Sequence, residues 1–312
     1  MDKRDRIYVA GSETVVGKAL LRKLAAGGYF NVIDTSSEEP DLTDRAKVDA
    51  YFEAMRPDYV FLAAGKSGGI GANQKYPADL MLNNLLIQCQ VIRSAQRHGA
   101  RKLLYVASSC SYPRSCPQPM QVRFLMTGPL ESTSEAYAMA KIAGIKLCQA
   151  YQQQHGADMI SVIPGDVFGP GDDFSLEDSH VIAALIRKMH QAKIDGAPTV
   201  EVWGSGSPRR EFIFVDDVAD AAIFLMQSYS DSIAVNVGSG SEISIRNIAE
   251  LIRRVVGYNG QLRFDSTKPD GMPLKALDSS ALMAMGWRPK VSLQRGLEET
   301  YRWFLETTKE DV

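Results

Sequence analysis

The sequence predicts an α/β fold with a doubly wound parallel sheet, and three observations support this prediction. Short runs rich in β-branched and aromatic residues alternate with longer amphipathic segments through the first half of the chain. A glycine turn joins the first run to the first predicted helix. The 312 residues are 45% hydrophobic and 23% charged, which leaves enough apolar surface for a full core. Such alternation implies right-handed βαβ crossovers and a sheet covered on both faces.

The first domain is expected to contain short buried strands connected by helices. The strands are predicted at residues 7–10, 32–33, 59–62 and 103–106, and the helices at residues 16–25, 46–55 and 80–98. Each predicted strand is short and mostly apolar, as expected for strands that are buried on both faces. We assign residues 1–168 to this domain.

The alternation ends after Gly165, where a Gly-Pro-Gly turn follows. Further helices are predicted near residues 180–192, 245–256 and 293–305, with short strands at 200–202 and 262–264. We expect these separated segments to form a smaller, discontinuous C-terminal substrate domain, mainly residues 169–312. A return segment at about residues 205–240 is assigned to the first domain.

Composition excludes several classes of partner. The formal net charge is −2, and Lys and Arg form no long block, so we expect no nucleic-acid partner. Apolar runs are much shorter than the roughly 18 residues of a membrane span, so we expect no membrane partner and a cytoplasmic location. The four cysteines lack C-x-x-C spacing, which favours free thiols in a reducing compartment and predicts no metal site: Cys89, Cys110, Cys116 and Cys148.

The turn after the first strand is a candidate phosphate-binding loop. Gly11 and Gly17 bracket it, and Thr14 stands where a middle glycine is usual. A tight glycine turn at a helix N-terminus lets phosphates approach backbone N–H groups, which is typical of a Rossmann dinucleotide domain. A plain strand-to-helix turn is an equally good interpretation of this segment alone. In the first interpretation the cofactor contacts are Gly11, Thr14, Val15, Val16 and Gly17.

The end of the second predicted strand bears on which nicotinamide cofactor is used. Asp34 stands there, and a carboxylate at this place can accept hydrogen bonds from a ribose 2′-hydroxyl. No Arg or Lys stands near it in the sequence, which argues against a strong preference for NADP. Asp34 could instead cap a helix or a surface turn. Asp41 and Leu42 could border the adenine pocket, although Asp41 is equally plausible as a cap.

Three residues form a candidate catalytic group. Tyr137 and Lys141 are four residues apart in a helix-prone stretch, so they project from one helix face. A phenol is a poor proton shuttle at neutral pH unless a neighbouring ammonium favours the phenolate. Ser108 directly follows a strand, and the carboxyl edge of a parallel sheet is where such folds bind ligands. A hydroxyl there could hold the carbonyl that is reduced.

Cys110 and His180 could transfer protons at carbons beside a ketone, because a thiol and an imidazole both titrate near neutral pH. Taken alone, each has a simpler interpretation. A cysteine is most often a small buried hydrophobe, and a histidine at a helix start is most often a cap.

Two longer stretches resemble the GDP-L-fucose synthase family of extended short-chain dehydrogenases/reductases. Residues 104–113 carry a Ser-Ser-Cys-x-Tyr-Pro run, and residues 128–144 carry the Tyr-x-x-x-Lys motif. The resemblance returns in Gly68 to Asn73, Ser179 to Ile182, Trp203 to Asp217 and Lys268 to Asp278, so it covers essentially the whole chain.

The resemblance implies an epimerase-reductase that acts on a GDP-linked keto sugar and forms a homodimer. Cys110 and His180 would epimerise C3 and C5, after which Tyr137, with Lys141 and Ser108, would support hydride delivery to C4. The implied cofactor contacts also include Ala63, Ala64, Lys141, Pro164 and His180. The implied substrate contacts are Asn84, Ser109, Asp166, Arg187, Trp203, Arg210 and Lys275.

The chain also departs from the family pattern. The family has Gly-His-Arg-Gly where this chain has residues 11–14, and arginines where Thr35 and Ser37 stand. Those arginines serve NADP, so we predict NAD or NADP as cofactor, with NAD accepted at least as well. Asp166 replaces an asparagine near the sugar and could change the substrate or the outcome.

Two alternatives therefore remain open. One is a GDP-sugar C4 reductase, dehydrogenase or epimerase alone, with NAD as cofactor. The other is a non-catalytic dinucleotide sensor, which would not need all five candidate catalytic residues.

Overall fold

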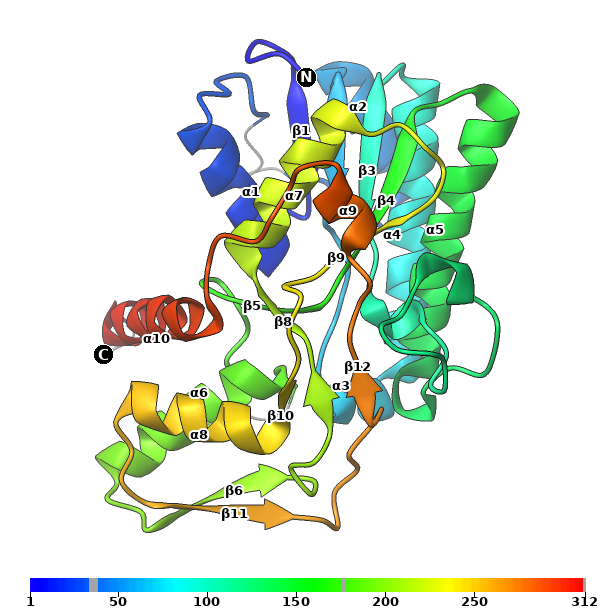
Figure 1. The fold of residues 1–312 in the computed structure, drawn as a ribbon. Coiled ribbons are helices and arrows are strands. Elements are labelled where there is room, and N and C mark those ends of the chain that lie inside the picture. Colours follow the sequence, from blue (N-terminus) through cyan, green and yellow to red (C-terminus); the bar gives the residue numbers. More distant parts are fainter. Residues whose placement is uncertain (34–38, 176–177, 311–312) are drawn as a thin grey trace.

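The computed structural model describes residues 1–33, 39–175 and 178–310, with side chains described up to residue 307. A parallel five-stranded sheet lies at its centre, and its strand order is β1-β2-β3-β4-β9 (Figure 1). The doubly wound α/β prediction is confirmed. The five strands are β1 Ile7–Ala10, β2 Tyr59–Leu62, β3 Lys102–Val106, β4 Met159–Pro164 and β9 Val235–Val237.

The predicted strand at residues 32–33 is present only as an isolated parallel bridge between Val32 and Ile7. Ile33 N–H still donates to the Ile7 carbonyl at 2.8 Å, so the chain runs along the sheet edge. The residues that follow, Asp34 among them, lie outside the described part of the chain.

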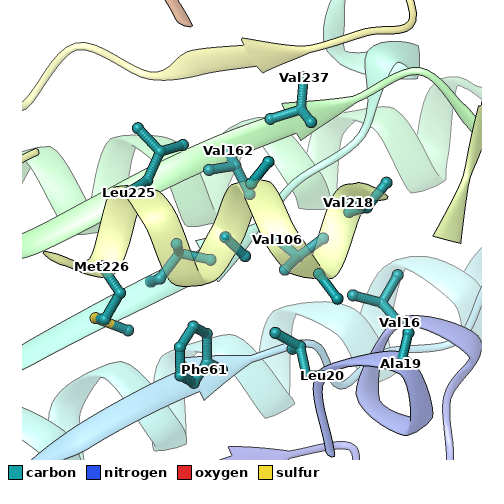
Figure 2. Packing of buried hydrophobic residues seen from close by; sticks show 14 of the residues in the cluster. Val16, Ala19, Leu20, Phe61, Val106, Val162, Val218, Leu225, Met226 and Val237 are labelled. Atoms are coloured by element: carbon teal, nitrogen blue, oxygen red, sulfur yellow. The ribbon is translucent and has the colours of Figure 1, made fainter. Parts of the chain in front are cut away.

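Helices cover both faces of the sheet. On one face α1 and α7 pack over Phe61, Val106 and Val162, as Figure 2 shows. On the other face residues of α2, α4 and α5 share a second buried cluster with Val60, Leu62 and Tyr105. Two covered faces explain why the strands have no alternation of polar residues. The covering helices are α1 Val15–Ala26, α2 Arg45–Met55, α4 Pro77–Arg97, α5 Glu135–His155 and α7 Val215–Ser228.

A third buried cluster belongs to the C-terminal half, where Phe168, Phe212 and Phe214 share a core with residues of three helices. Its small sheets are β6 with β11, β5 with β8, and β10-β7-β12. The helices are α6 Val181–Ile194, α8 Ile245–Val256 and α10 Leu293–Glu310. The strands are β5 Asp166–Phe168, β6 Thr199–Trp203, β7 Arg209–Arg210, β8 Phe212–Phe214, β10 Ile243–Ser244, β11 Gln261–Asp265 and β12 Leu274–Lys275.

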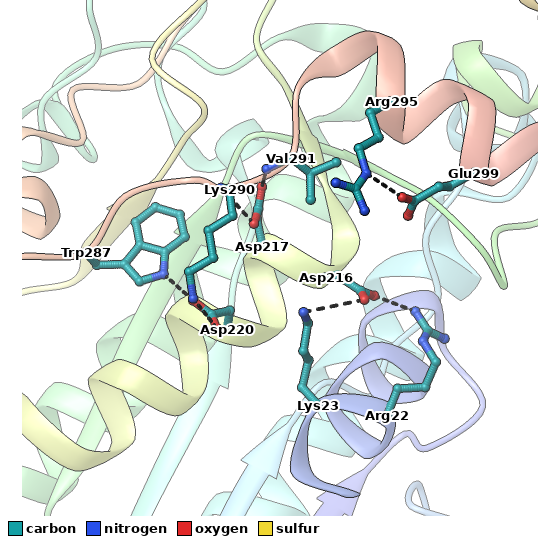
Figure 3. Close-up of polar contacts among 10 residues, drawn as sticks. All are labelled: Arg22, Lys23, Asp216, Asp217, Asp220, Trp287, Lys290, Val291, Arg295 and Glu299. Carbon is teal, nitrogen blue, oxygen red and sulfur yellow. Dashed lines mark hydrogen bonds and ion pairs between the residues drawn. The ribbon is translucent and has the colours of Figure 1, made fainter. Parts of the chain in front are cut away.

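Carboxylates of α7 bind the C-terminal segment to the domain that contains the central sheet (Figure 3). Asp217 accepts from the backbone N–H groups of Lys290 and Val291, both at 3.0 Å. Asp220 accepts from Trp287 Nε1 and Lys290 Nζ, both at 2.9 Å. These contacts hold residues 287–291, just before α10, against the domain of the central sheet.

Short helices complete the described elements: α3 Ile70–Lys75, α9 Ser280–Ala284, and the 3-10 helices η1 Ser109–Ser111, η2 Val122–Phe124 and η3 Ser132–Ser134. Among the helices that the structure describes, none combines the length and apolar character needed to cross a bilayer.

Candidate active site

A cleft of about 980 Å³ opens at the carboxyl ends of the central strands. Its walls come from the turn after β1, the segments after β2, β3 and β4, and the C-terminal half. This is the edge at which doubly wound sheets bind ligands. Fifteen of the predicted site residues line it: Thr14, Val15, Val16, Ala63, Ala64, Ser108, Cys110, Tyr137, Lys141, Pro164, Asp166, His180, Trp203, Arg210 and Lys275.

The turn after β1 has the shape of a phosphate cradle. Gly11 adopts φ +82°, and a Cβ there would lie 2.4 Å from the Ala64 Cα. A Cβ on Gly17 would lie 2.0 Å from the Gly11 carbonyl oxygen. Both positions therefore require glycine. Thr14 needs no such freedom, because it adopts an extended conformation and its hydroxyl caps α1 by accepting from Gly17 N–H at 3.0 Å.

These residues fit a dinucleotide. The N-terminus of α1 faces the cleft through Thr14, Val15 and Val16, and a helix N-terminus favours phosphate. Within the described chain, the buried Ser12 Oγ in the same turn has no hydrogen-bond partner. A ligand with acceptor oxygens near this turn would satisfy such donors.

Glu39 contacts this turn, and sequence patterns did not predict that contact. Its Oε1 accepts from Gly11 N–H at 2.7 Å and from the Tyr8 hydroxyl at 3.0 Å. Burial raises the pKa of Glu39, and the hydrogen bonds from Gly11 and Tyr8 partly offset that rise. A carboxylate thus lies against the first glycine of the loop, five positions beyond the predicted Asp34.

Tyr137, Lys141 and Ser108 come together as predicted from their spacing. The Lys141 ammonium lies 5.8 Å from the centre of the Tyr137 ring and donates to the Val106 carbonyl at 3.1 Å. Burial lowers the pKa of Lys141 to about 8. Burial chiefly, and Cys110 next, raise the pKa of Tyr137, whereas its hydrogen bond with Ser108 lowers it. A protonated Lys141 is the group in this trio that can favour the phenolate.

Cys110 lies in the cleft beside this trio, and Lys275 lies beside Cys110. The Lys275 ammonium is 4.0 Å from the Cys110 sulfur and 2.5 Å from an oxygen of Asp166. The other Asp166 oxygen is 3.8 Å from Arg210 Nε. Cys148 is buried like an ordinary core thiol, whereas Cys110 is only partly buried.

His180 is exposed and lines the cleft at the start of α6. It is the N-cap residue, but its side chain makes no capping hydrogen bond to the described residues. Asp172 lines the cleft nearby, where burial raises its pKa and the charge of His180 lowers it. The imidazole is therefore directed to the cleft and has a carboxylate as a neighbour.

Trp203 and Lys188 line the far side of the cleft, and Lys268 lies next to the Trp203 ring. Trp203 is 43% exposed, and the ammonium groups of Lys188 and Lys268 lie 5.4 and 5.2 Å from its ring centre. Arg187, expected here, instead donates from the surface to the Phe174 carbonyl at 2.8 Å and is absent from the described lining. Its neighbour Lys188 lines the cleft. Helix geometry decides this difference, because consecutive residues point about 100° apart.

Several other predicted residues lie behind the walls rather than in them. Asn84 is buried and donates to the carbonyls of Lys66 and Leu80, so it supports the loop after β2. Ser109 is buried in η1, and Leu42 belongs to the core. Asp41 accepts from the backbone N–H and the hydroxyl of Thr43 in a local turn, and Asp44 is the residue that caps α2. Gly11 and Gly17 shape the loop from beneath.

Comparisons with known proteins agree with this geometry. The model of the NAD dependent epimerase/dehydratase family matches residues 7–238. GDP-L-fucose synthase 1 of Arabidopsis thaliana is 53% identical, over 98% of this chain and 94% of its own length. The structure of a GDP-6-OMe-4-keto-L-xylo-heptose reductase from C. jejuni aligns with a TM-score of 0.93 at 30% identity, over 98% of this chain and 99% of that one.

A GDP-L-fucose synthetase from Naegleria fowleri bound to NADP aligns with a TM-score of 0.91 at 25% identity, over 99% of this chain and 96% of that one. The loop, the cleft and the Tyr-x-x-x-Lys pair thus occur together in a chain whose relatives match it over nearly its full length. The chain belongs to the NAD dependent epimerase/dehydratase family and is an NAD(P)-dependent enzyme of the extended short-chain dehydrogenase/reductase type.

Proposed function

We propose that the chain is an epimerase-reductase that converts a GDP-4-keto-6-deoxyhexose to a GDP-L-sugar. One observation carries the proposal: Cys110 lies beside Tyr137 and Ser108, while His180 lines the same cleft. A reductase alone needs the phenol and the hydroxyl but has no use for a thiol and an imidazole. The names of the plant relative and the amoebal structure support the same substrate class.

The residues divide the chemistry into two stages. In the first, Cys110 and His180 remove and return protons at the carbons that flank the ketone, which inverts C3 and C5. In the second, Ser108 holds the ketone oxygen and Tyr137 gives it a proton, with Lys141 favouring the phenolate that remains. The reduced nicotinamide supplies the hydride when bound. Trp203, Arg210 and Lys188 would hold the GDP part, since cations pair with diphosphate and a flat ring stacks on a base.

The test is incubation with GDP-4-keto-6-deoxymannose in deuterated water, with and without NADPH or NADH. We expect deuterium at C3 and C5, and loss of the reduced cofactor's absorbance. Tyr137→Phe should keep the exchange and lose reduction, whereas Cys110→Ala should lose the exchange. Reduction without deuterium at either carbon would contradict the proposal.

That outcome would favour the second candidate, a GDP-sugar C4 reductase. The structural match to a C. jejuni enzyme named as a reductase is the observation that supports it. In this case Cys110→Ala should reduce a C4 ketone at the rate of the unaltered enzyme.

We also propose that NAD is accepted at least as well as NADP. Glu39 places a carboxylate on the Gly11 N–H, and Glu13 adds a second one at the cleft. Both would repel a 2′-phosphate, which needs Arg or Lys. Titration with both reduced cofactors checks this, and NADPH binding about tenfold more tightly than NADH would refute it.

We propose a homodimer formed through α4 and α5, which pack against each other. Leu82 on α4 and Met139 on α5 are 57% and 46% exposed, so each helix offers an apolar side chain to a second copy. Light scattering should give twice the chain mass, and Leu82→Glu should give the mass of one chain. We place the enzyme in the cytoplasm, because all four cysteines are free thiols.

A further inference from the structure

Lys275 has a position that its expected role does not explain. The resemblance assigns it to the GDP diphosphate, yet its ammonium lies between the Asp166 carboxylate and the Cys110 sulfur, at 2.5 and 4.0 Å. Its side chain is only 11% exposed. A lysine whose donors already face a carboxylate and a thiol has little left for a diphosphate.

The surroundings keep this ammonium charged. Burial lowers the pKa of Lys275, but the Asp166 carboxylate and then Cys110 outweigh burial, so its pKa is raised. Asp166 is itself bracketed by Arg210 Nε at 3.8 Å. The family pattern has an asparagine at this position, which would hold a lysine through an amide oxygen without the charge.

We infer that Lys275 is a positioning residue for Cys110: its ammonium stabilises the thiolate, and Asp166 fixes the ammonium next to the sulfur. This assignment deepens the proposed function and rests on it. In the step concerned, the thiolate takes a proton from the carbon beside the ketone, an S–H bond forms and a C–H bond breaks. The electron pair of that bond passes to the ketone oxygen as an enolate. His180 then returns a proton to the opposite face.

The charged and titratable groups near Cys110 are few in the described chain. Lys275 faces it from β12 and Tyr137 from α5. Asp166 and Arg210 stand behind Lys275 on β5 and β7. Lys141 lies beside Tyr137, and His180 lines the same cleft. Because both stay unchanged when Lys275 is replaced, a substitution at Lys275 tests its own charge.

The decisive measurement is the alkylation rate of Cys110 by iodoacetamide in the full chain without substrate, followed by mass spectrometry. Trypsin cuts after Lys102 and Arg114, so Cys110 is alone in its peptide and Cys116 falls in the next. We expect Lys275→Met to slow Cys110 alkylation about tenfold near neutral pH. Lys275→Arg keeps the charge and should restore most of the rate.

Two other cysteines serve as internal controls that would detect misfolding of a variant. The rate at Cys116 should stay unchanged, and the buried Cys148 should stay protected in every variant. An unchanged rate of Cys110 alkylation in folded Lys275→Met would overturn the inference.

The part of Asp166 is tested by a double-mutant cycle. In an Asp166→Asn background, Lys275→Met should slow alkylation by clearly less than the about tenfold effect expected in the unaltered chain. An equal effect in both backgrounds would show that Asp166 does not position the lysine.

Affinity for GDP separates this role from a diphosphate contact. Calorimetry should give Lys275→Met a GDP dissociation constant within about threefold of the unaltered chain. A larger loss together with a normal alkylation profile would restore the diphosphate role. If alkylation depends on Lys275 but no deuterium enters C3 or C5, the epimerase function fails while the pairing of Lys275 with the thiolate stands. Deuterium entry at an unchanged rate in Lys275→Met would remove Lys275 from the reaction.

Discussion

Lys141 carries a charge into a part of the protein with little access to water. Its side chain is 6% exposed, and burial lowers its pKa to about 8. The unfolded chain therefore binds more protons than the folded one between about pH 8 and pH 10.4, and over that window this residue makes stability rise with pH. At lower pH the full cost of burying the ammonium is present.

Replacing Lys141 by methionine should remove this pH dependence. We expect the free energy of unfolding of Lys141→Met, relative to the unaltered chain, to fall by about 1 kcal/mol or more between pH 7 and pH 10. Urea unfolding at several pH values measures it. A constant difference across the range would show that burial does not lower the pKa of Lys141.

The same residue should set the alkaline limb of the reduction. Because the ammonium favours the Tyr137 phenolate, kcat/KM for reduction should fall as pH rises through about 8. Lys141→Arg keeps its charge at that pH, so any activity that it retains should lack this limb. A decline that persists unchanged in Lys141→Arg would assign it to another group.

At the level of single residues, sequence patterns predicted the positions of the candidate catalytic residues better than those of the residues around Trp203. Ser108, Tyr137 and Lys141 could be predicted because a strand end and a helical four-residue spacing determine where they lie. Lys188 could not, because choosing between it and Arg187 requires the helix rotation to within one residue. Glu39 could not either, since its contact with Gly11 depends on the path of a loop.

At the scale of the elements, two glycines at the two ends of α1 separate the effect of backbone conformation from the effect of steric space. Gly11 and Gly28 both have positive φ, +82° and +74°. A Cβ would clash with Ala64 at the first and meet nothing within 4 Å at the second. The two glycines therefore have similar backbone conformations but different steric surroundings.

Gly28→Ala should cost about 1 kcal/mol of stability and leave cofactor affinity unchanged, because only backbone strain is added. Gly11→Ala adds a backbone clash, so it should cost about 2 to 4 kcal/mol and weaken cofactor binding strongly. Denaturant unfolding and cofactor titration of both variants check this. Equal costs would mean that the loop can move away from Ala64.

The described helices and strands agree closely with the predicted ones where periodicity is long. The helix predicted at residues 245–256 is α8 to the residue. The helix predicted at 16–25 is one residue shorter than α1 at each end, and that at 46–55 lacks only the first residue of α2. The strand at 32–33 is reduced to a bridge because its partner β1 pairs on that side only at Ile7. The six-residue α3 carries too little periodicity to be distinguished from a loop.

At the scale of the whole molecule, α7 joins the two ends of the chain. Asp216 pairs with Arg22 of α1 at 2.7 Å on the surface, whereas the adjacent Asp217 is 2% exposed and holds two backbone N–H groups of the segment before α10. Adjacent carboxylates thus serve opposite sides of the helix.

Asp217→Ala should cost about 2 to 4 kcal/mol, because two backbone donors lose their partner in a buried place. Asp216→Ala should cost less than about 1 kcal/mol, because its ion pair is partly exposed to water. Urea unfolding of both variants gives the comparison. A larger loss for Asp216 would contradict this view of the junction.

The separation of Cys110 and Lys275 along the chain has a consequence during synthesis. The two residues are 165 positions apart. A ribosome exposes the cysteine long before it makes the lysine, so a nascent chain carries a thiol that has not yet acquired its cationic neighbour. The sulfur becomes more reactive only after Lys275 has been made and has folded next to it, which spares the earlier nascent chain from oxidation and alkylation.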